Sequence, residues 1–333
     1  MVGSTILVTG GAGFIGSNIV ATLLEDPGCE VVVCDRLRQS DSGKWRNLAK
    51  HPISDIIPPE RLFEWLDGSG HAVDLIVHMG AVSSTLETDA DRILINNFAL
   101  SRDLFRWCAA RGRRFLYASS AATYGDGARG FDDSQEAAAL SALRPLNPYG
   151  WSKALFDLFA VRQAAAGQAP PSWTGLKFFN VYGPNEGHKG AMGSVVSQIW
   201  PTVAAGEPVR LFKSYRTEFP DGGQSRDFVY VRDVADCVGW LTRSSGVNGV
   251  FNLGSGQARS FADLARAVFA AAGQVPRIDY IEMPEARRGA YQYYTRAGVD
   301  RLRSLGWTAS ATSLEDGVAD YVERYLSKPD PYR

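Results

Sequence analysis

The chain has 333 residues, of which 45% are hydrophobic and 21% are charged, and its formal net charge is -1. This composition is typical of a globular protein with a large core, and the length predicts about two domains. The near-zero net charge excludes a global basic field that would attract nucleic acid or an anionic membrane. No apolar run approaches the roughly 20 residues needed to span a bilayer, and the N-terminus does not resemble a signal peptide, so we expect a cytoplasmic protein.

In chain order, the first half alternates apolar runs with helix-like segments. The runs are continuous rather than alternating, which suits strands buried on both faces of a parallel sheet, and they cover residues 5–9, 31–35, 75–79 and 115–119. The helix-like segments cover residues 16–25, 59–66, 90–111 and 148–165. This order predicts an α/β protein with a Rossmann-like, doubly wound parallel sheet.

The second half is less regular. Strands are expected at 226–231 and 250–253, helices at 195–204, 234–243, 261–272 and 314–326, and turns at 222–224 and 254–256. We therefore predict a dinucleotide-binding domain over residues 1–180 and a smaller α/β substrate-binding lobe mainly over 181–333. A late segment, roughly 226–256, is expected to return to the first domain.

A glycine-rich loop follows the first predicted strand and opens the first predicted helix. Residues 9–16 read T-G-G-A-G-F-I-G, with Gly10, Gly13 and Gly16 at three-residue steps. Glycine lets the backbone approach a pyrophosphate, and a helix N-terminus offers free N–H groups and a positive dipole end. Asp35 ends the second predicted strand, where a ribose-binding carboxylate is expected. The pattern predicts a bound nicotinamide dinucleotide.

The basic residues near Asp35 bear on which dinucleotide is bound. Asp35 favours NAD, because its carboxylate can accept hydrogen bonds from the ribose hydroxyls. Arg36, Arg38 or Lys44 could instead neutralise a 2′-phosphate, unless they only form a solvated loop. We expect NADP, with NAD tolerated.

A Y-x-x-x-K motif, Tyr149 to Lys153, lies at the start of a predicted helix that Pro148 opens. Residues i and i+4 share a helix face, so the Lys153 ammonium can lie near the phenol. A nearby cation, together with a positive nicotinamide ring, favours the phenolate, and Tyr149 is then usable as a base. Ser120 follows the fourth apolar run, where it can bind the reacting hydroxyl, although a serine there can also be a simple helix cap.

These residues resemble the extended short-chain dehydrogenase/reductase family of nucleotide-sugar enzymes, over nearly the whole chain. Dehydratases of that family carry an acidic pair directly after the serine or threonine. This chain has Ala121 and Ala122 there, which cannot donate or accept a proton, so the resemblance favours epimerisation or simple redox chemistry over elimination.

Further strings are similar to one branch of that family, the 6-epimerases of nucleotide-diphosphate heptoses. The strings are G-A-V-S-S-T-L-E (80–87), A-S-S-A-A-T-Y-G (118–125), K-F-F-N-V-Y-G-P-N-E-G-H-K-G-A-M (177–192), L-F-K-S (211–214), R-D-F-V-Y-V-R-D-V (226–234) and M-P-E-A-R-R-G-A-Y-Q-Y-Y-T (283–295). The resemblance implies transient oxidation of C6 of an ADP-bound heptose through a keto intermediate with bound NADP. It also implies a role in making lipopolysaccharide core precursors.

The resemblance implies a second base at Lys189; the alternative is that Lys189 only binds a phosphate or a sugar hydroxyl. His188 is expected to form a hydrogen bond within its loop. Cofactor contacts are implied for Gly10, Gly13, Phe14, Ile15, Gly16, Asp35, Arg36, Lys44, Met79, Gly80, Ala81, Ser83, Asn96, Lys153 and Val181. Substrate contacts are implied for Ser83, Asn180, Ala191, Gln198, Phe212, Lys213, Ser214, Tyr215, Arg226 and Tyr291. Arg226 suits a diphosphate, with a salt bridge to Asp227 or Asp233 as the alternative; core packing is the alternative for Tyr291.

The chain departs from the branch pattern at a few positions. Ala191 replaces a serine, Gln198 replaces a histidine, Pro58-Pro59 replace a lysine, and the insert at 215–222 is long. These changes leave open another nucleotide-sugar epimerase or reductase, acting on a UDP- or GDP-sugar. A non-catalytic NADP-binding regulator is a third hypothesis, disfavoured because Ser120, Tyr149 and Lys153 are all present. We expect a homo-oligomer, by resemblance.

The cysteines and histidines carry no further signal. The four cysteines, which we expect to be buried free thiols, lack a C-x-x-C pair: Cys29, Cys34, Cys108 and Cys237. The four histidines form no ligand-spaced pair, and we expect no metal site: His51, His71, His78 and His188.

Overall fold

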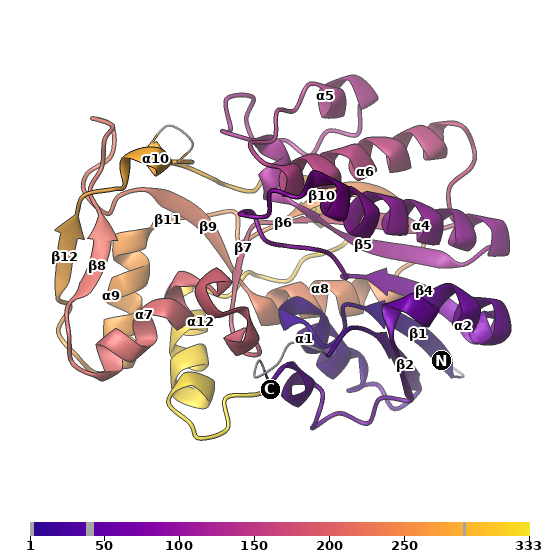
Figure 1. Ribbon diagram of the computed structural model, residues 1–333, viewed down its shortest axis with the longest axis horizontal. Helices are drawn as coiled ribbons and strands as arrows, with labels where there is room; N and C mark the ends of the chain where they lie inside the picture. The colour runs from indigo at the N-terminus through magenta and orange to yellow at the C-terminus, as the bar shows by residue number, and fades with distance from the viewer. Residues whose placement is uncertain (1–2, 38–42, 289–290) are drawn as a thin grey trace.

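The computed structural model describes residues 3–37, 43–288 and 291–333. Within these residues, a central sheet of seven parallel strands has the order β10-β6-β5-β4-β1-β2-β3 (Figure 1). The strands are β1 (Ser4–Thr9), β2 (Cys29–Cys34), β3 (Asp55–Ile57), β4 (Val73–His78), β5 (Arg114–Ser120), β6 (Trp173–Phe178) and β10 (Gly249–Leu253). The predicted α/β class and Rossmann-like sheet are confirmed.

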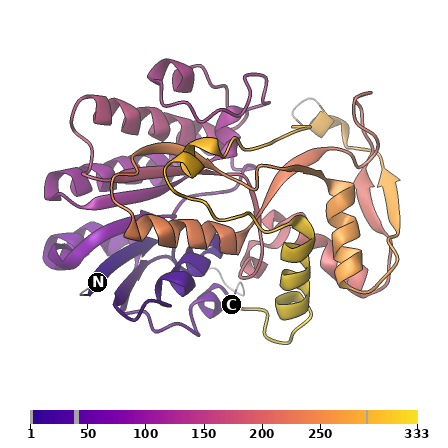
Figure 2. The ribbon, with the colours of Figure 1, turned by 180° about the vertical axis from the view of Figure 1, so that it is seen from behind.

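Helices cover both faces of this sheet, because its strands are apolar on both sides. One core packs α1 (Phe14–Leu23), α8 (Val231–Arg243) and α11 (Asp300–Ser304) against the first face. The other packs α2 (Leu62–Ser69), α4 (Leu100–Arg111) and α6 (Pro148–Ala165) against the second. Figures 1 and 2 show α4 and α6 on one side of the sheet and α8 across the other.

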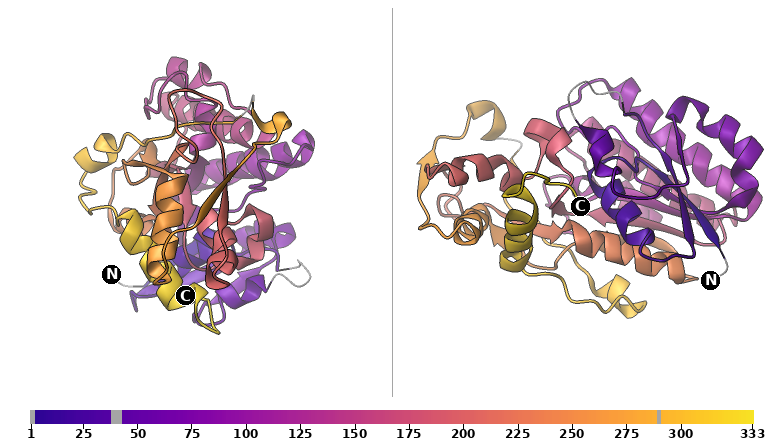
Figure 3. Two further views of the ribbon diagram at one scale, coloured as in Figure 1. Left: turned by 90° about the vertical axis from the view of Figure 1, so that its left-hand side faces the viewer. Right: turned by 90° about the horizontal axis from the view of Figure 1, so that it is seen from below.

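A smaller lobe lies beyond one end of the sheet (Figure 3). It holds the sheet of β7 (Asn180–Tyr182), β9 (Ser225–Tyr230) and β11 (Ala258–Ser260), and the pair β8 (Val209–Phe212) and β12 (Ile278–Ile281). Its core is packed by α7 (Val195–Ala204), α9 (Phe261–Ala271), α12 (Leu314–Tyr321) and the π-helical turn η7 (Val322–Leu326). The segment expected to return to the main sheet divides: β9 lies in the smaller sheet, and β10 adds the seventh strand of the large one.

The remaining short elements connect these layers. They are the 3-10 turns η1 (Lys44–Asn47), η2 (Pro59–Arg61), η3 (Gly70–Ala72), η5 (Ala121–Tyr124) and η6 (Gly187–Met192), with α3 (Ala90–Ile93), η4 (Leu94–Ala99), α5 (Ala137–Ser141) and α10 (Glu285–Arg288).

Some elements differ from the sequence expectation. Strand β6 was not predicted, because Gly175 and Lys177 interrupt its apolar run, yet both lie in a fully buried strand. The helix expected at 90–111 contains the π-helical segment η4, and π-turns often mark functional sites. The helix expected at 59–66 begins with the 3-10 turn η2, and its α-helical part covers Leu62–Ser69.

The C-terminal residues lie against the start of the chain. The Arg333 guanidinium donates hydrogen bonds to the Thr22 hydroxyl at 2.9 Å and to the Glu25 carboxylate at 3.0 Å, both at the end of α1. The Arg333 backbone N–H donates to Asn185 Oδ1 at 2.9 Å. Figure 1 shows the C-terminus beside α1. Residue 333 thus joins the first helix to the loop after β7.

The described cysteines are free thiols, as expected, and three of the four are buried. No described helix is long and apolar enough to cross a membrane. No group of three or more His, Cys, Asp or Glu side chains suited to a metal ion occurs among the residues that the structure describes.

We expect Gly175→Ala to destabilise the protein. An added Cβ would overlap the ring of Tyr117, which is 1% exposed and has no room to move. Overpacking of this kind costs about 1–3 kcal/mol of unfolding free energy, measured by urea denaturation. The matched control is Gly68→Ala in α2, where an added Cβ meets nothing within 4 Å, and helix propensity predicts a gain of up to about 1 kcal/mol. Equal stabilities of the two variants would contradict this packing.

Candidate active site

The glycine loop lies at the carboxyl end of β1, directly before α1. A Cβ on Gly10 would lie 2.6 Å from the backbone nitrogen of Gly80, and a Cβ on Gly16 would overlap the Gly10 carbonyl oxygen. Gly10 also has a positive φ of 68°. Gly10, Gly16 and Gly80 thus allow the loops after β1 and β4 to meet at the N-terminus of α1. The result is a backbone cradle that fits a pyrophosphate.

Asp35 closes one side of this cradle. Its carboxylate accepts the backbone N–H of Ala12 at 2.9 Å and binds the Lys44 ammonium at 2.6 Å. Arg36 instead forms an exposed ion pair with Glu60 at 2.8 Å. Lys44 is therefore the basic residue next to the predicted ribose position, and Arg38 lies outside the described residues.

The predicted catalytic residues come together where η5 meets α6. Asn147 caps α6 by accepting the backbone N–H of Gly150 at 2.8 Å, and a Cβ on Gly150 would lie 2.7 Å from the Ala122 carbonyl oxygen. This close approach brings the hydroxyls of Ser120 and Tyr149 into hydrogen-bond contact. Ser120 also caps η5, accepting the Ala122 N–H at 3.1 Å, so the two predicted roles of this serine coexist.

The protonation of this pair differs from the sequence expectation. Burial raises the pKa of Tyr149 above its ordinary 10; the hydrogen bond with Ser120 opposes that shift and the Asp157 carboxylate adds to it. Burial lowers the pKa of Lys153 from 10.5 to about 8, with Asp157 opposing. The Lys153 ammonium donates to the Ala118 carbonyl at 2.7 Å. The protein alone thus favours the neutral phenol, because desolvation outweighs the attraction of a nearby cation.

A buried hydrogen-bond chain, not predicted from the sequence, runs from the glycine cradle to α6. The Gly80 N–H donates to Thr9 Oγ1 at 3.2 Å, Thr9 Oγ1 lies 2.6 Å from His78 Nδ1, and His78 Nε2 lies 2.8 Å from Ser101 Oγ. The Ser101 hydroxyl donates to the Asn97 carbonyl, so it accepts from His78, and His78 is the Nε2–H tautomer.

Asn97 continues the hydrogen-bond chain to α6, the helix of the predicted catalytic residues Tyr149 and Lys153. Its side-chain amide binds both backbone groups of Val82 and donates to Ser152 Oγ at 3.1 Å, and Ser152 donates to the Tyr149 carbonyl at 2.7 Å. Asn97 is 1% exposed. Its neighbour Asn96, the predicted cofactor contact, binds the Arg92 carbonyl of its own helix. A buried asparagine inside a π-helical turn is recognised only in the structure.

The loop that holds Lys189 is fixed by buried polar contacts. The Glu186 carboxylate is 1% exposed and binds the backbone N–H of Ser194 at 2.5 Å and its hydroxyl at 2.6 Å. Lys189 lies with its ammonium 5.2 Å from the ring centroid of Phe14, at the cradle. Burial lowers the pKa of Lys189, with Glu186 opposing. His188 lies 3.3 Å from the Asn47 amide nitrogen, the expected loop contact.

In the smaller lobe, three predicted substrate residues form one cluster. The Arg226 guanidinium lies 5.4 Å from the ring of Tyr291, and the Phe212 ring lies 6.4 Å from the same ring. Arg226 is 8% exposed and donates to the Ser225 carbonyl. Asp227 and Asp233 accept from other groups, so the alternative salt bridge is not seen among the described contacts. Burial lowers the pKa of Arg226.

The insert after β8 is held by Glu282 and Tyr293. Glu282 binds the Lys213 ammonium at 2.7 Å and accepts the Tyr215 hydroxyl. The Tyr215 N–H donates to the Tyr293 hydroxyl at 3.0 Å, and Ser214 binds Asp221 and Arg216 within the insert. The predicted substrate residues Lys213, Ser214 and Tyr215, which follow β8, are therefore all held by polar contacts.

The two departures at Ala191 and Gln198 contact each other. Gln198 Nε2 donates to the Ala191 carbonyl at 3.2 Å and to the Gly193 carbonyl at 2.6 Å. Both residues are exposed; Ala191 lies in η6 and Gln198 in the first turn of α7. The remaining predicted contacts follow the carboxyl ends of three strands of the main sheet. They are Gly13, Phe14 and Ile15 after β1, Met79, Gly80, Ala81 and Ser83 after β4, and Asn180 and Val181 on β7, which follows β6.

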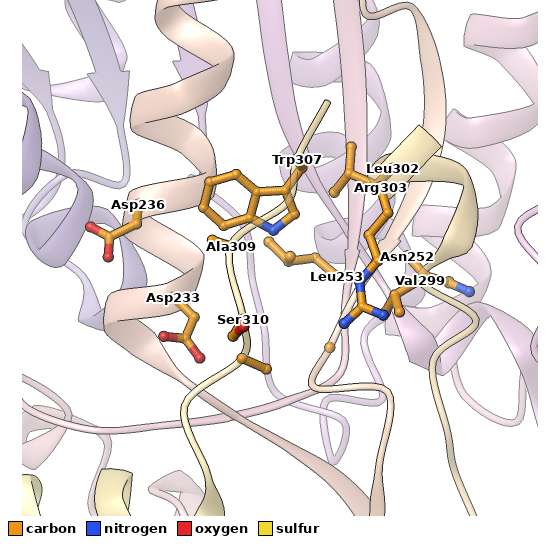
Figure 4. A pocket seen from close by; sticks show the side chains of 12 residues that line it. Asp233, Asp236, Asn252, Leu253, Val299, Leu302, Arg303, Trp307, Ala309 and Ser310 are labelled. Atoms are coloured by element: carbon orange, nitrogen blue, oxygen red, sulfur yellow. The ribbon is translucent and has the colours of Figure 1, made fainter. Parts of the chain in front are cut away.

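A separate cavity of about 80 Å³ lies between α8 and the segment after α11 (Figure 4). Asp233, Asp236, Asn252, Arg303 and Trp307 are among its lining residues, and none of the predicted cofactor or substrate residues lines it. The Asp233 carboxylate is already bonded to the Thr312 backbone and hydroxyl at 2.8 and 2.6 Å. This cavity is therefore not the site of the Tyr149 chemistry.

Comparison with known proteins agrees with this geometry. Residues 6–254 match the model of the NAD dependent epimerase/dehydratase family. ADP-L-glycero-D-manno-heptose-6-epimerase of Fusobacterium nucleatum is 45% identical over 335 residues, covering 98% of this chain and 99% of that protein. The enzyme of the same name from Nitratidesulfovibrio vulgaris is 47% identical over 328 residues, with 98% and 99% covered.

One solved structure is similar to this chain over nearly its whole length. The crystal structure of Helicobacter pylori ADP-L-glycero-D-manno-heptose-6-epimerase superimposes with a TM-score of 0.80 at 28% identity. The match covers 97% of this chain and 96% of that one.

We expect His78 to weaken the protein in acid. Burial lowers the pKa of His78 to about 3, whereas an unfolded histidine titrates near about 6.5, so the unfolded chain binds more protons between these values. The free energy of unfolding should therefore fall as the pH falls through this window, by up to about 1.4 kcal/mol per pH unit.

The measurement is urea unfolding of His78→Gln and the parent protein at several pH values. The variant should show the shallower pH dependence, and His71→Gln, at an exposed histidine, should match the parent. Identical slopes for all three proteins would show that His78 is not held neutral.

Proposed function

The chain belongs to the NAD dependent epimerase/dehydratase family, and we propose that it epimerises C6 of ADP-D-glycero-β-D-manno-heptose to give ADP-L-glycero-β-D-manno-heptose. The reaction supplies a precursor of the lipopolysaccharide core. The observation that carries the proposal is the contact of Ser120 with Tyr149, on the helix of Lys153, beside the glycine cradle. Relatives covering the whole chain supply the sugar.

The cofactor is a nicotinamide dinucleotide, and we propose NADP. Gly10, Gly16 and Gly80 would hold the pyrophosphate, because a side chain at Gly10 or Gly16 would collide with the backbone of the cradle and push its loops apart. Lys44 would bind the 2′-phosphate, and its ion pair with Asp35 already offsets the carboxylate charge that would repel that phosphate. When bound, the oxidised nicotinamide ring supplies a hydride acceptor that carries positive charge and returns the hydride later in the cycle.

The chain's own residues manage the protons. Oxidation of the C6 carbinol removes one hydride and one proton and leaves a ketone. Ser120 binds the C6 oxygen and Tyr149 accepts its proton, for which the phenol must first be ionised. The Lys153 ammonium, fixed on the Ala118 carbonyl, adds positive potential at the phenol.

Epimerisation needs the second hydride transfer to reach the opposite face of C6. We propose that the ketone reorients and that Lys189 then provides the proton for the new hydroxyl. Its position against Phe14 and its lowered pKa support this role, because a partly desolvated ammonium gives up its proton more readily. The carboxylate of Glu186 limits the shift and holds the loop in place.

We propose that Arg226 binds the diphosphate of the substrate. It is a buried cation that forms no ion pair with a carboxylate of the described residues, and the Tyr291 and Phe261 rings flank it at 5.4 and 5.5 Å. A buried guanidinium is costly unless an anion pairs with it, and a diphosphate supplies that anion. Phe212 and Tyr291 would pack beside it, and Lys213, Ser214 and Tyr215 would line the entrance.

The proposal includes a cytoplasmic homo-oligomer. Large apolar side chains are exposed on neighbouring helices, with Ile95 of η4 at 64% and Trp151 of α6 at 44%. Such residues mark protein contacts when they gather on one surface, and a second copy of this chain is the partner that we propose.

The test is incubation of the purified protein, without added cofactor, with ADP-D-glycero-β-D-manno-heptose, followed by NMR of the sugar. We expect the C6 epimer and no lasting rise in the absorbance of reduced nicotinamide. An unchanged heptose, with protein shown to hold NADP, would overturn the proposed substrate. UDP- and GDP-sugars would then be tested, with Ala191, Gln198 and the insert at 215–222 as the first candidates for altered specificity.

We expect Tyr149→Phe to lower kcat by at least about 100-fold, because a general base typically contributes a factor of about 100 to 10,000. Retention of dinucleotide should not change, because the phenol hydroxyl is not part of the cradle. Tyr280→Phe, at an exposed tyrosine of β12, is the matched control and should keep full activity. Substantial epimerisation by Tyr149→Phe would remove Tyr149 from the mechanism.

Lys44→Met should lower the preference for NADP over NAD by about 10-fold or more, because loss of one charge-assisted phosphate contact costs about 1.5–3 kcal/mol. The measurement is titration of each dinucleotide into protein stripped of cofactor. Lys50→Met is the control, since Lys50 pairs with Asp330 rather than with Asp35. An unchanged preference would move the 2′-phosphate site elsewhere.

A further inference from the structure

A second buried network lies between α6 and the main sheet. At its centre is an ion pair whose side chains are inaccessible to solvent. The Asp157 carboxylate and the Lys177 ammonium lie 3.0 Å apart, and both side chains are 0% exposed. Asp157 is on α6, four residues after Lys153 and eight after Tyr149, so all three share a helix face. Lys177 is on the neighbouring strand β6.

Every polar atom of this pair has further partners. Asp157 accepts the Tyr117 hydroxyl at 2.9 Å and the Ser119 hydroxyl at 2.7 Å, both from β5. Lys177 donates to Thr123 Oγ1 at 2.7 Å and lies 4.6 Å from the centroid of the Tyr124 ring. The pair therefore connects α6 to β5, β6 and η5.

The network ends at the catalytic residues. The Thr123 hydroxyl donates to the Ser120 carbonyl at 2.8 Å, so the Lys177 side of the pair reaches the backbone of Ser120. The Asp157 side reaches Tyr149 and Lys153 along one helix face. The negative charge of Asp157 raises the pKa of both Tyr149 and Lys153.

We propose that Asp157 and Lys177 are positioning residues that hold α6 against β5 and together set the electrostatic potential at Tyr149 and Lys153. A buried ion pair is a weak source of stability, because desolvation offsets its attraction. Because the two charges have opposite signs, removal of Asp157 and removal of Lys177 would change the potential at the catalytic pair in opposite directions. The proposal rests on the proposed role of Tyr149 as proton acceptor.

Apart from Lys153, the other titratable groups around the pair do not change their charge near neutral pH. Burial raises the pKa of Tyr117 on β5 and of Tyr124 on η5 well above 10, and Asp133 adds to the shift of Tyr124. His78 on β4, which faces Lys153, has a pKa lowered to about 3. All three therefore stay neutral near neutral pH, and Lys153 is the neighbour that titrates close to it.

The experiment is the pH profile of kcat for three variants of the NADP-loaded protein. Asp157→Asn removes a negative charge, so the apparent pKa values of the Tyr149–Lys153 pair should both fall and the whole profile should move to lower pH by roughly half to one unit. Lys177→Met removes a positive charge, so the profile should move the opposite way. The double variant removes both charges and should return close to the parent profile.

A purely structural pair would give another pattern: both single variants would lose activity or stability with the profile unmoved, which would overturn the proposal. Asp157→Glu keeps the charge, and the profile should stay in place even if kcat falls. If one single variant does not fold, the other single variant still tests the proposal: its profile should move in the direction set by the charge that it removes and should return towards the parent in the double variant. Opposite shifts support the proposal, and shifts of one sign or none refute it.

A second readout does not depend on the substrate. Proteins labelled with 13C at the tyrosine ring carbon that carries oxygen allow the Tyr149 phenol to be titrated by NMR in the NADP-loaded state, with Tyr149→Phe assigning the signal. Opposite shifts in Asp157→Asn and Lys177→Met would support the pair's role even if the sugar proved to be different. An unmoved Tyr149 titration would overturn it whatever the sugar.

Discussion

Polar groups buried beneath the sheet edge need hydrogen-bond partners, and this constraint determines where α6 lies, the helix of Tyr149 and Lys153. In a low-dielectric interior, an unpaired donor or acceptor costs about 1–3 kcal/mol, so each group fixes its neighbour. Two networks meet on α6. One runs from the glycine cradle through His78 and Asn97 to the Tyr149 carbonyl, and the other joins Asp157 to β5 and β6. Tyr149 is therefore held from both the cofactor side and the sheet side.

The predicted substrate residues in the smaller lobe are held by a different kind of contact. They are held by aromatic rings and by one another rather than by a continuous hydrogen-bond chain. Arg226 lies between the Phe261 and Tyr291 rings, while Lys213 and Tyr215 share the Glu282 carboxylate. The exposed contacts of Lys213 and Tyr215 exchange readily with water or with a bound anion, whereas Arg226 is buried. The predicted catalytic residues thus lie in fixed hydrogen-bond networks, whereas part of the predicted substrate set lies on a more adaptable surface.

The sequence predicted the sheet, the glycine loop and the Tyr149 pair because each depends on local spacing. The boundaries of α6 and α7 were predicted to the residue, since Asn147 with Pro148 and Ser194 give clear start signals. Strand β6 was missed because Lys177 looks like a surface residue until Asp157, twenty positions earlier, is seen to pair with it. His78 was considered only as a possible metal ligand, and its hydrogen-bond role depends on Thr9 and Ser101. The spacing of Tyr149 and Lys153 predicts that they share a helix face, but it says nothing about the burial that raises the pKa of Tyr149 in the protein alone.

The contacts of Arg333 have a consequence for how the chain reaches its final state. Its hydrogen bonds to α1 connect residues more than 300 positions apart, with sequence separations of 311 and 308 for Thr22 and Glu25. Contacts this distant form late, because a long loop must close before they are gained. On a ribosome, the first helix emerges early, yet it lacks these partners until synthesis reaches residue 333. The glycine loop and α1 are thus synthesised long before the arginine that binds them in the folded protein.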